Sequence, residues 1–344
     1  MKSVSVAMAT YNGARHIQQQ LDSLAAQSYL PAELVISDDR SDDDTLAIIQ
    51  DFAETAPFPV ALHVNNDRLG YRRNFMQAAR LSRSELIAFC DQDDRWYPHK
   101  LAVIVEAFTN PDVLLAYHNA DVVGHDGARY GSLGEYRAKR RSNLPMSLGP
   151  WTYALGFTQV FRRSMLELAR FWPESLDHNA TGERMAHDQW YFFLASVFGS
   201  IIYHHEPLVA YIQHGGNTYG LERKHVAVSA IRFLTENRKG HIARYAVALE
   251  RRASILESAA AELDEPWQAR ARAAASRYRE LGMLYAEQRN LYLSPRFPRR
   301  LSVFGNLVTK HGYRPYWGLG RRALIKDASL GLLLGPRLRR PVDA

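Results

Sequence analysis

The sequence predicts an α/β protein with a Rossmann-like, mostly parallel sheet flanked by helices, and a helical appendage after it. Through residue 108, short apolar runs alternate with segments of helical periodicity. The apolar runs are nearly continuous, as is typical of strands covered on both faces. Beyond residue 221 the chain is rich in Ala, Leu, Arg and Glu at helical spacing. The first two observations predict the sheet, and the third predicts the appendage.

Four strands, each followed by a helix, are expected in the first part of the chain. The strands are predicted at residues 4–9, 34–36, 60–64 and 86–90. The helices are predicted around residues 17–25, 46–52, 75–81 and 101–108. Ligands of such sheets bind beyond the carboxyl ends of the strands, so the functional site is expected there.

The second half is expected to complete this domain and then become helical. A loop leading into a strand is predicted over residues 151–161, a helix after Ala186 and a strand over 208–212. Appendage helices are predicted within 226–234, 242–263 and 267–293. We divide the chain into a domain of residues 1–220, an appendage of residues 221–293 and a tail of residues 294–344. The appendage is as compatible with a lid as with an oligomerisation surface.

The composition is that of an ordinary globular protein. Of 344 residues, 47% are hydrophobic and 23% are charged. The single cysteine, Cys90, lies in an apolar run, which indicates a buried residue in a reducing compartment rather than a nucleophile. No run approaches the ~18 apolar residues of a membrane span, and the first residues lack the apolar core of a signal peptide. A cytoplasmic location is therefore expected.

Positive charge is concentrated in the tail. Residues 294–344 contain eleven Lys/Arg and two Asp, a net charge of +9, whereas the whole chain has +7. Aromatic residues and the aliphatic run Leu330–Leu334 lie between these charges. The pattern is typical of a segment that contacts an anionic membrane surface, and we expect peripheral contact with the inner face of the cytoplasmic membrane. A solvated tail and nucleic-acid binding are the alternatives, and the aliphatic clusters argue against nucleic acid.

Polar clusters follow each of the four predicted strands. They are Thr10-Tyr11-Asn12, Asp38-Asp39, Asn65-Asn66-Asp67 and Asp91-Gln92-Asp93-Asp94. Carboxylates crowded at one edge repel one another unless a cation is present. Oxygen ligands without Cys or His beside them favour Mg²⁺ or Mn²⁺. The motif alone is equally compatible with Asp91–Asp94 capping the helix that Pro98 introduces.

Four stretches resemble the glycosyltransferase family 2 enzymes of the GT-A fold, particularly bacterial transferases of surface-polysaccharide assembly. The stretches are SVAMATYNGARHIQQQLDSLAAQS, LVISDDRSDDDT, NDRLGYRRNF and FCDQDDRW. The second differs from the family pattern at Arg40, where Gly is usual. The last resembles the family's D-x-D metal motif. Together the four stretches span about the first hundred residues, and the combination is more specific than any one of them.

The resemblance implies where a nucleotide-sugar donor binds. Thr10, Tyr11 and Asn12 would border the base. Asp38 or Asp39 would accept a hydrogen bond from the imide N–H of uracil or thymine, which cytosine lacks.

The resemblance also implies how the sugar and phosphates are held. Asn74 would lie near the ribose or the phosphates, and Gln92 near the nucleotide sugar. Asp91 would reach the ribose or the metal shell. Asp93 would bind the Mn²⁺ or Mg²⁺ ion itself.

The acceptor side is implied by a second set of residues. Asp188, at the start of an apolar helix, would be the general base, with His187 supporting it. From the residues alone, Asp188 is more simply the N-cap of that helix. His214, in the stretch YIQHGGNTYG, would complete the metal shell or touch the diphosphate, and a surface histidine is an equal alternative.

The implied activity is inverting, metal-dependent transfer of a sugar to a glycan or lipid-linked saccharide acceptor. The stretches HDQW and HGGN are similar to those of rhamnosyltransferases, which favours dTDP-L-rhamnose over a UDP-sugar as donor. The Q-x-x-R-W motif of processive synthases is absent from the sequence, which favours non-processive transfer.

Three other functional classes are alternatives to a glycosyltransferase. An oxidoreductase is disfavoured because the first turn, TYNGAR, has no G-x-G-x-x-G. A sugar nucleotidyltransferase would be expected to carry a loop rich in Gly and basic residues at the same place. A non-catalytic nucleic-acid-binding protein would use the basic tail and would not need Asp93 or Asp188.

Overall fold

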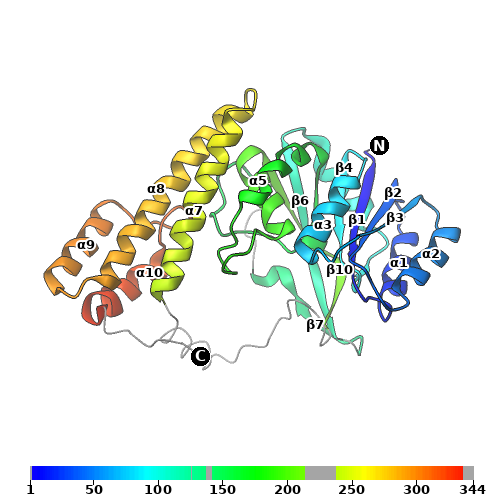
Figure 1. Cartoon of the computed structure of the whole chain (residues 1–344), viewed down its shortest axis with the longest axis horizontal. Coiled ribbons are helices and arrows are strands. Elements are labelled where there is room, and N and C mark those ends of the chain that lie inside the picture. The colour runs from blue at the N-terminus through cyan, green and yellow to red at the C-terminus, as the bar shows by residue number, and fades with distance from the viewer. Residues whose placement is uncertain (1, 125, 137–141, 214–237, 336–344) are drawn as a thin grey trace. The chain divides into compact units, whose positions relative to one another are not determined.

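The computed structural model describes residues 2–124, 126–136, 142–213 and 238–335 (Figure 1). By its internal contacts the chain divides into two compact units. The first comprises Met1–Ser147, Thr152–Arg170 and Ala186–Leu221, and the second comprises Leu148–Trp151, Phe171–Met185 and Glu222–Ala344. Two short segments that we assigned to the first domain thus group with the helical part.

The four strand–helix pairs occur where the sequence predicts them. The strands are β1 (Val4–Thr10), β2 (Glu33–Asp38), β3 (Val60–Val64) and β4 (Leu86–Cys90). The helices are α1 (Ile17–Ala25), α2 (Thr45–Thr55), α3 (Tyr71–Leu81) and α4 (Lys100–Val105), the last extended by the 3-10 turn η1 (Glu106–Thr109). Every residue of β1 and β4 is buried, Cys90 included, which explains why these runs are predominantly apolar.

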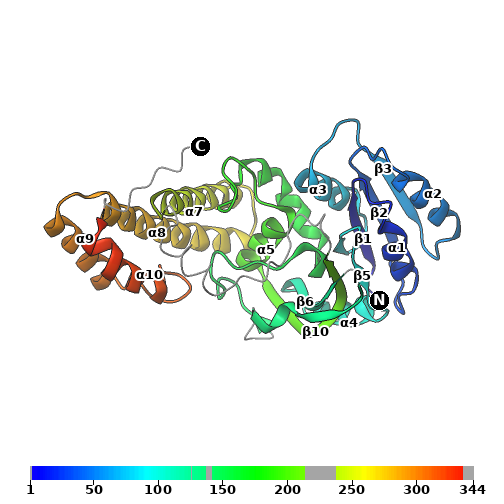
Figure 2. The ribbon, with the colours of Figure 1, turned by 90° about the horizontal axis from the view of Figure 1, so that it is seen from below.

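The order in which strands are added to the sheet changes direction at β1. The parallel strands lie in the order β3-β2-β1-β4, so the sheet extends to one side of β1 first and to the other side afterwards. Helices α1 and α2 cover one face of these strands, and α3 covers the other (Figure 2). Such a reversal leaves a crevice beyond the carboxyl ends of the two central strands, which here are β1 and β4.

The rest of the sheet is mixed. Strand β9 (Gln159–Arg162) lies antiparallel between β4 and β6 (Val113–Gly124), and β6 runs parallel to β10 (Ser200–Gln213). Three short strands pair antiparallel at the margins: β5 (Arg95–Trp96), β7 (Arg129–Ser132) and β8 (Ser142–Asn143). Helix α5 (His187–Phe198) packs on β6 and β10. The sequence did not indicate β6, because the buried His118 and Asn119 interrupt its apolar run.

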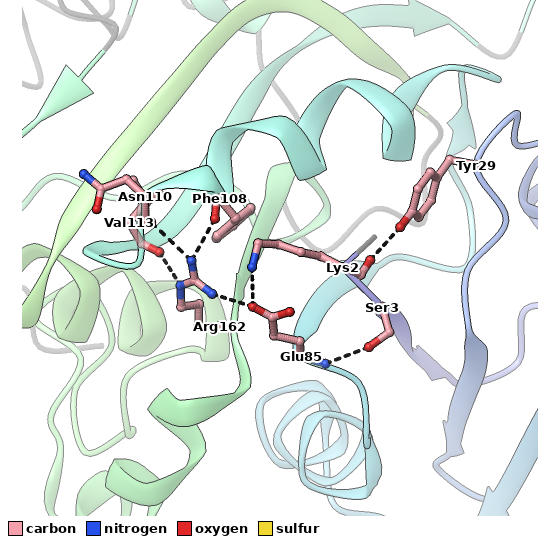
Figure 3. A network of polar contacts seen from close by, with 8 residues as sticks. All are labelled: Lys2, Ser3, Tyr29, Glu85, Phe108, Asn110, Val113 and Arg162. Carbon is pink, nitrogen blue, oxygen red and sulfur yellow. Dashed lines mark hydrogen bonds and ion pairs between the residues drawn. The ribbon is translucent and has the colours of Figure 1, made fainter.

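A network of charges fastens the amino edge of the sheet (Figure 3). The Arg162 guanidinium donates to the Glu85 carboxylate (2.7 Å) and to the carbonyls of Val113 (2.8 Å) and Phe108 (2.9 Å). Lys2 Nζ lies 2.6 Å from the same carboxylate. These contacts tie the end of β9 to the starts of β4 and β6. Lys2 and Arg162 lower the pKa of Glu85.

The second unit is helical. Its long helices α7 (Arg238–Ala260) and α8 (Trp267–Leu293) pack side by side, followed by α9 (Phe297–Thr309), α10 (Arg321–Lys326) and the π-helical turn η5 (Asp327–Gly331). The described part of the predicted tail is therefore folded. The helix predicted at 226–234 lies outside the described residues. Across the described ranges, no helix has the length and apolar character needed to cross a membrane.

Aromatic contacts explain why the loop segments Leu148–Trp151 and Phe171–Met185 belong to this unit. The Trp151 ring lies 4.5 Å from His178 and 4.3 Å from Tyr245 of α7, between ring centroids. Its indole N–H donates to the hydroxyl of Tyr285 on α8 (3.2 Å). Burial lowers the pKa of His178 to about 3, so this ring packs as a neutral aromatic group.

Candidate functional site

The ends of β1 and β2 are joined by Asp38. Its carboxylate is fully buried and accepts hydrogen bonds from Thr10 Oγ1 (2.7 Å), Ser41 Oγ (2.6 Å) and the Ser41 N–H (2.8 Å). Asp38 thus sets the spacing between the two loops that the resemblance assigns to the base.

The loop after β1 is fixed by the loop after β2. Asn12 has a φ of +48°, and its side-chain amide exchanges two hydrogen bonds with Asp42. The Gly13 N–H donates to Thr45 Oγ1 (2.8 Å). Arg40 has a φ of +65°, the left-handed region that favours glycine. This backbone conformation explains why Gly would be usual at that position.

Asp39 faces the loop that follows β3. Its carboxylate accepts from the N–H groups of Leu69 (2.6 Å) and Gly70 (2.7 Å) and from Asn65 Nδ2 (3.3 Å). Asn65 also donates to Asn74 Oδ1 (2.9 Å), and Asn74 donates to the Thr10 carbonyl (3.1 Å). Asn74 is buried, so it links the ends of β1 and β3.

Gln92 clamps the backbone of Tyr11. Its side chain accepts from the Tyr11 N–H (3.0 Å) and donates to the Tyr11 carbonyl (3.1 Å). Gly13 lies so close to Gln92 that a side chain there would collide with it. The exposed guanidinium of Arg68 stacks 3.8 Å from the centroid of the Tyr11 ring. We did not single out Arg68 from the sequence, where its only signal is a basic residue in the loop after β3.

The carboxylates after β4 lie close to the start of α5. Burial, together with the negative charges of Asp93 and Asp188, raises the pKa of Asp91 to about 8. Residues almost a hundred positions apart in the sequence therefore form one acidic cluster. None of them is the N-cap of α4, which is His99.

Asp94 and Lys100 interact electrostatically with this cluster. Asp94 Oδ1 accepts from the Ile212 N–H (3.2 Å), whereas Oδ2 is buried without a hydrogen-bond partner among the described residues. Lys100 is fully buried; its Nζ donates to the Phe157 carbonyl (2.8 Å) and lies 3.3 Å from the Trp96 ring centroid. Burial lowers the pKa of Lys100 to about 7, so at neutral pH this cation only partly balances the carboxylates.

Asp188 is the second residue of α5, whose N-cap is Ala186. Eleven of the twelve residues of this helix are buried, and Asp188 is 9% exposed. Its Oδ1 accepts from the adjacent Gln189 N–H (2.8 Å), and Gln159 Nε2 donates to its backbone carbonyl (3.1 Å). The simpler N-cap interpretation therefore does not describe Asp188, although its charge lies in the first turn, where the helix dipole stabilises it.

His187 contributes packing beside Asp188. Its ring stacks on Phe75 at 3.8 Å and meets the edge of Phe89 at 4.6 Å, between centroids. A Cβ on Gly156 would come within 2.5 Å of His187 Nε2, so only glycine fits there. Neither ring nitrogen has a hydrogen-bond partner in the described part of the chain, and burial lowers the pKa of His187 to about 3. Any support for Asp188 from this neutral ring is steric.

The segment that leads into α5 is held at Met185, three residues before Asp188. Within the second unit, Trp172 Nε1 donates to the Met185 carbonyl (2.9 Å) and the Met185 N–H donates to Ser175 Oγ (3.1 Å).

The acidic cluster fits a divalent cation that takes other ligands from a phosphate. The described residues contain no group of three or more His, Cys, Asp or Glu side chains arranged to hold a metal alone, and His214 lies outside them. Crowded carboxylates and the unpartnered Asp94 oxygen nevertheless show that negative charge here is incompletely balanced. Mg²⁺ and Mn²⁺ are commonly bound by one or two carboxylates together with substrate phosphates.

Comparison with known proteins shows what this chain is similar to. Residues 5–168 match the family model described as Glycosyl transferase family 2. An uncharacterized glycosyltransferase of Nostoc sp. is 28% identical over 220 residues, which cover 63% of this chain and 66% of that protein. The dTDP-rhamnosyl transferase RfbG of Shigella flexneri is 26% identical over 221 residues, covering 62% of this chain and 73% of that protein. The match to the Nostoc protein thus spans slightly less than two thirds of that protein, and a match to a Mycobacterium bovis protein spans 37% of it.

Among solved structures, S. aureus TarS 1-349 in complex with UDP-GlcNAc is similar in fold. The TM-score is 0.50 at 16% sequence identity, and the alignment covers 89% of this chain and 81% of that chain. The predicted GT-A architecture is thereby confirmed.

Proposed function

We propose that the chain, whose residues 5–168 match glycosyl transferase family 2, is a glycosyltransferase. It transfers a sugar from a nucleoside-diphosphate sugar with inversion of the anomeric configuration. The observation that carries the proposal is that the negative charges of Asp93 and Asp188 both act on Asp91. A general base beside carboxylates suited to a phosphate-bound cation is what sugar transfer requires.

The loops after β1 and β2 support binding of a uracil or thymine nucleotide. Thr10, Tyr11 and Asn12 are held rigidly by Asp38, Gln92 and the loop of residues 41–45. The proposed acceptor of the imide N–H at the ends of these loops is Asp38 or Asp39. The name of the RfbG relative favours dTDP-L-rhamnose, with a UDP-sugar as the alternative donor.

The chemistry follows from two groups of carboxylates. Asp188 takes the proton of an acceptor hydroxyl as that oxygen attacks the anomeric carbon, and the bond from this carbon to the diphosphate breaks on the opposite face. Asp93, with Asp91 and His214, would hold Mn²⁺ or Mg²⁺, which stabilises the charge of the departing nucleoside diphosphate. Asn74 and Gln92 keep the loops around the donor in place.

The acceptor that we propose is a glycan or a lipid-linked saccharide used in cell-surface polysaccharide synthesis. Transfer would be non-processive. A lipid-linked acceptor lies at the membrane, which agrees with peripheral contact through residues 294–344.

The test is release of nucleoside diphosphate from a panel of UDP-, dTDP- and GDP-sugars with Mn²⁺, Mg²⁺ or EDTA. We expect metal-dependent release from one uracil- or thymine-linked donor, lost in Asp93→Ala and retained in the matched control Asp121→Ala, which changes an aspartate on β6 paired to Arg129. Failure of every donor to turn over or bind, or a product of retained configuration, would contradict the proposal.

A further inference from the structure

We propose that the α9–α10 end of the helical unit is a docking face for an anionic lipid bilayer. This inference deepens the proposed function and rests on it for the acceptor, which a membrane would deliver, but its test requires no catalysis. Figure 1 shows α9 and α10 at the same end of α8. We call the exposed apolar residues of this end the apolar face.

Exposed apolar side chains are concentrated in this small part of the molecule. Of the fourteen large hydrophobic side chains exposed in the described residues, eight lie between residues 293 and 334. They are Leu293, Phe297, Leu301, Val308, Tyr316, Ile325, Leu333 and Leu334. Single exposed apolar residues are common on any protein, but such a concentration marks an interaction surface.

Three members of the apolar face form a stripe along α9. Phe297, Leu301 and Val308 are 48%, 51% and 45% exposed, and they recur at positions i, i+4 and i+11. At 3.6 residues per turn these positions share one side of the helix. The buried side of α9 is a different one, which carries Arg300 and Leu307.

Arg300 joins the stripe to the rest of the apolar face. This buried guanidinium donates to the carbonyls of Leu332 (2.9 Å), Ser294 (3.1 Å) and Pro295 (3.1 Å). It therefore holds the start of α9 next to the backbone that carries Leu333 and Leu334. The apolar side chains of the two segments belong to one preformed surface.

The segment that carries the apolar face has a net positive charge. Residues 293–335 contain eight Lys/Arg and one acidic residue, Asp327. Asp327 is 0% exposed and accepts hydrogen bonds from Gln288 (2.8 Å), Tyr292 (2.5 Å) and Tyr313 (2.9 Å). The exposed arginines of this segment are Arg296, Arg299, Arg314, Arg321 and Arg322.

This combination selects a bilayer over other partners. A second copy of the chain would present the same arginines, and like charges repel across an interface. Nucleic acid would match the charge, but aliphatic side chains such as Leu301 and Ile325 gain nothing from a phosphate backbone. An anionic bilayer offers both headgroups for the arginines and hydrocarbon for the apolar side chains.

Sedimentation of the full-length protein with lipid vesicles tests the inference. We expect binding to vesicles of phosphatidylcholine with phosphatidylglycerol, weaker binding to phosphatidylcholine alone, and weakening as salt rises. The double variant Leu301→Asp/Ile325→Asp should bind at least tenfold more weakly. The matched control Val247→Asp changes a side chain on α7 that is 55% exposed, and it should bind like the wild type.

Thermal unfolding and nucleoside-diphosphate release distinguish a loss of membrane binding from misfolding of the variant and from failure of the transferase proposal. Both should be unchanged in the double variant, because its two side chains are exposed and distant in sequence from the catalytic residues. Absence of binding to anionic vesicles, or equal binding by the double variant, would overturn the docking face and leave the transferase proposal intact. Dimerisation in light scattering that Leu301→Asp abolishes, or a gel shift with DNA or RNA without vesicle binding, would also overturn it.

Discussion

Strand β4 has a carboxylate at each end, and the two behave in opposite ways. Glu85 precedes the strand and Asp91 follows it, with five buried residues between them. Lys2 and Arg162 lower the pKa of Glu85. Burial and the charges of Asp93 and Asp188 raise the pKa of Asp91 to about 8. One edge of the sheet thus pairs unlike charges, whereas the other gathers like charges.

The difference separates stability from function in this fold. Opposite charges at the amino edge close a network that needs no ligand (Figure 3). Like charges at the carboxyl edge are costly until a cation or a proton joins them. A site that is complete only with its ligand is expected to be less stable than the rest of the fold without it. The predictions below test this contrast, beginning with the largest effect.

Replacing the proposed base should abolish activity and spare the fold. Asp188→Asn keeps the shape of the side chain and removes the proton acceptor, so we expect the transfer rate to fall about 10²- to 10⁴-fold. Nucleoside-diphosphate affinity should remain within about twofold, and denaturant unfolding should show equal or higher stability because a repulsive charge is gone. Retention of more than a tenth of the activity would remove Asp188 from the mechanism.

Disrupting the amino edge should have the converse effect. Arg162→Met leaves the carbonyls of Val113 and Phe108 without their side-chain donor and leaves the Glu85 carboxylate with Lys2 alone, and we expect a loss of about 3 kcal/mol in unfolding free energy. The kcat of the folded protein should be unchanged. Lys2→Met, which removes an exposed ion pair, is the matched control and should cost less than about 1 kcal/mol. A catalytic defect in Arg162→Met at low temperature would contradict the separation.

Metal affinity should rise with pH. With a pKa of about 8, Asp91 is mostly protonated at pH 7, and a cation must displace that proton. Lys100, whose pKa is about 7, loses its opposing positive charge over the same range. We expect Mn²⁺ to bind about tenfold more tightly at pH 8.5 than at pH 7, measured by calorimetry with saturating nucleoside diphosphate. Asp91→Asn should reduce this slope, and an unaltered slope would show that Asp91 does not take part.

The smallest effect concerns backbone strain beside the nucleotide loops. Arg40 is exposed and has a φ of +65°, so Arg40→Gly should raise the unfolding free energy by about 0.5 kcal/mol. Arg15→Gly is the control, since Arg15 is also exposed and its φ is not positive; it should not stabilise. A destabilised Arg40→Gly variant would mean that the side chain makes a contact that outweighs the strain.

Most of the carboxylates at the carboxyl edge of the sheet could be predicted from the sequence, whereas the charge network at the amino edge could not. Polar residues at the ends of apolar runs are a local signal, so Asp38, Asp91 and Asp93 could be assigned to one edge from the strand pattern alone. The pairing of Arg162 with Glu85 joins residues 77 positions apart. It depends on β9 entering the sheet antiparallel to β4, which local periodicity does not encode.

The orientation of individual side chains also could not be predicted from the sequence. Asp38 and Asp39 are adjacent and of one type, yet Asp38 bonds Thr10 and Ser41 whereas Asp39 bonds the loop after β3. Their opposite directions follow from the end of β2, where successive side chains alternate. Similarly, the grouping of residues 171–185 with the helices depends on the packing of His178 against Trp151.

The most direct test of the like-charge edge is calorimetric titration of dTDP and UDP with Mn²⁺ and with EDTA. We predict that Mn²⁺ tightens binding of at least one of them tenfold or more in the wild type and in Lys2→Met, and has little effect in Asp93→Asn. Equal affinity with Mn²⁺ and EDTA in the wild type would contradict the account, because the carboxylates after β4 would then not bind a cation together with the nucleotide.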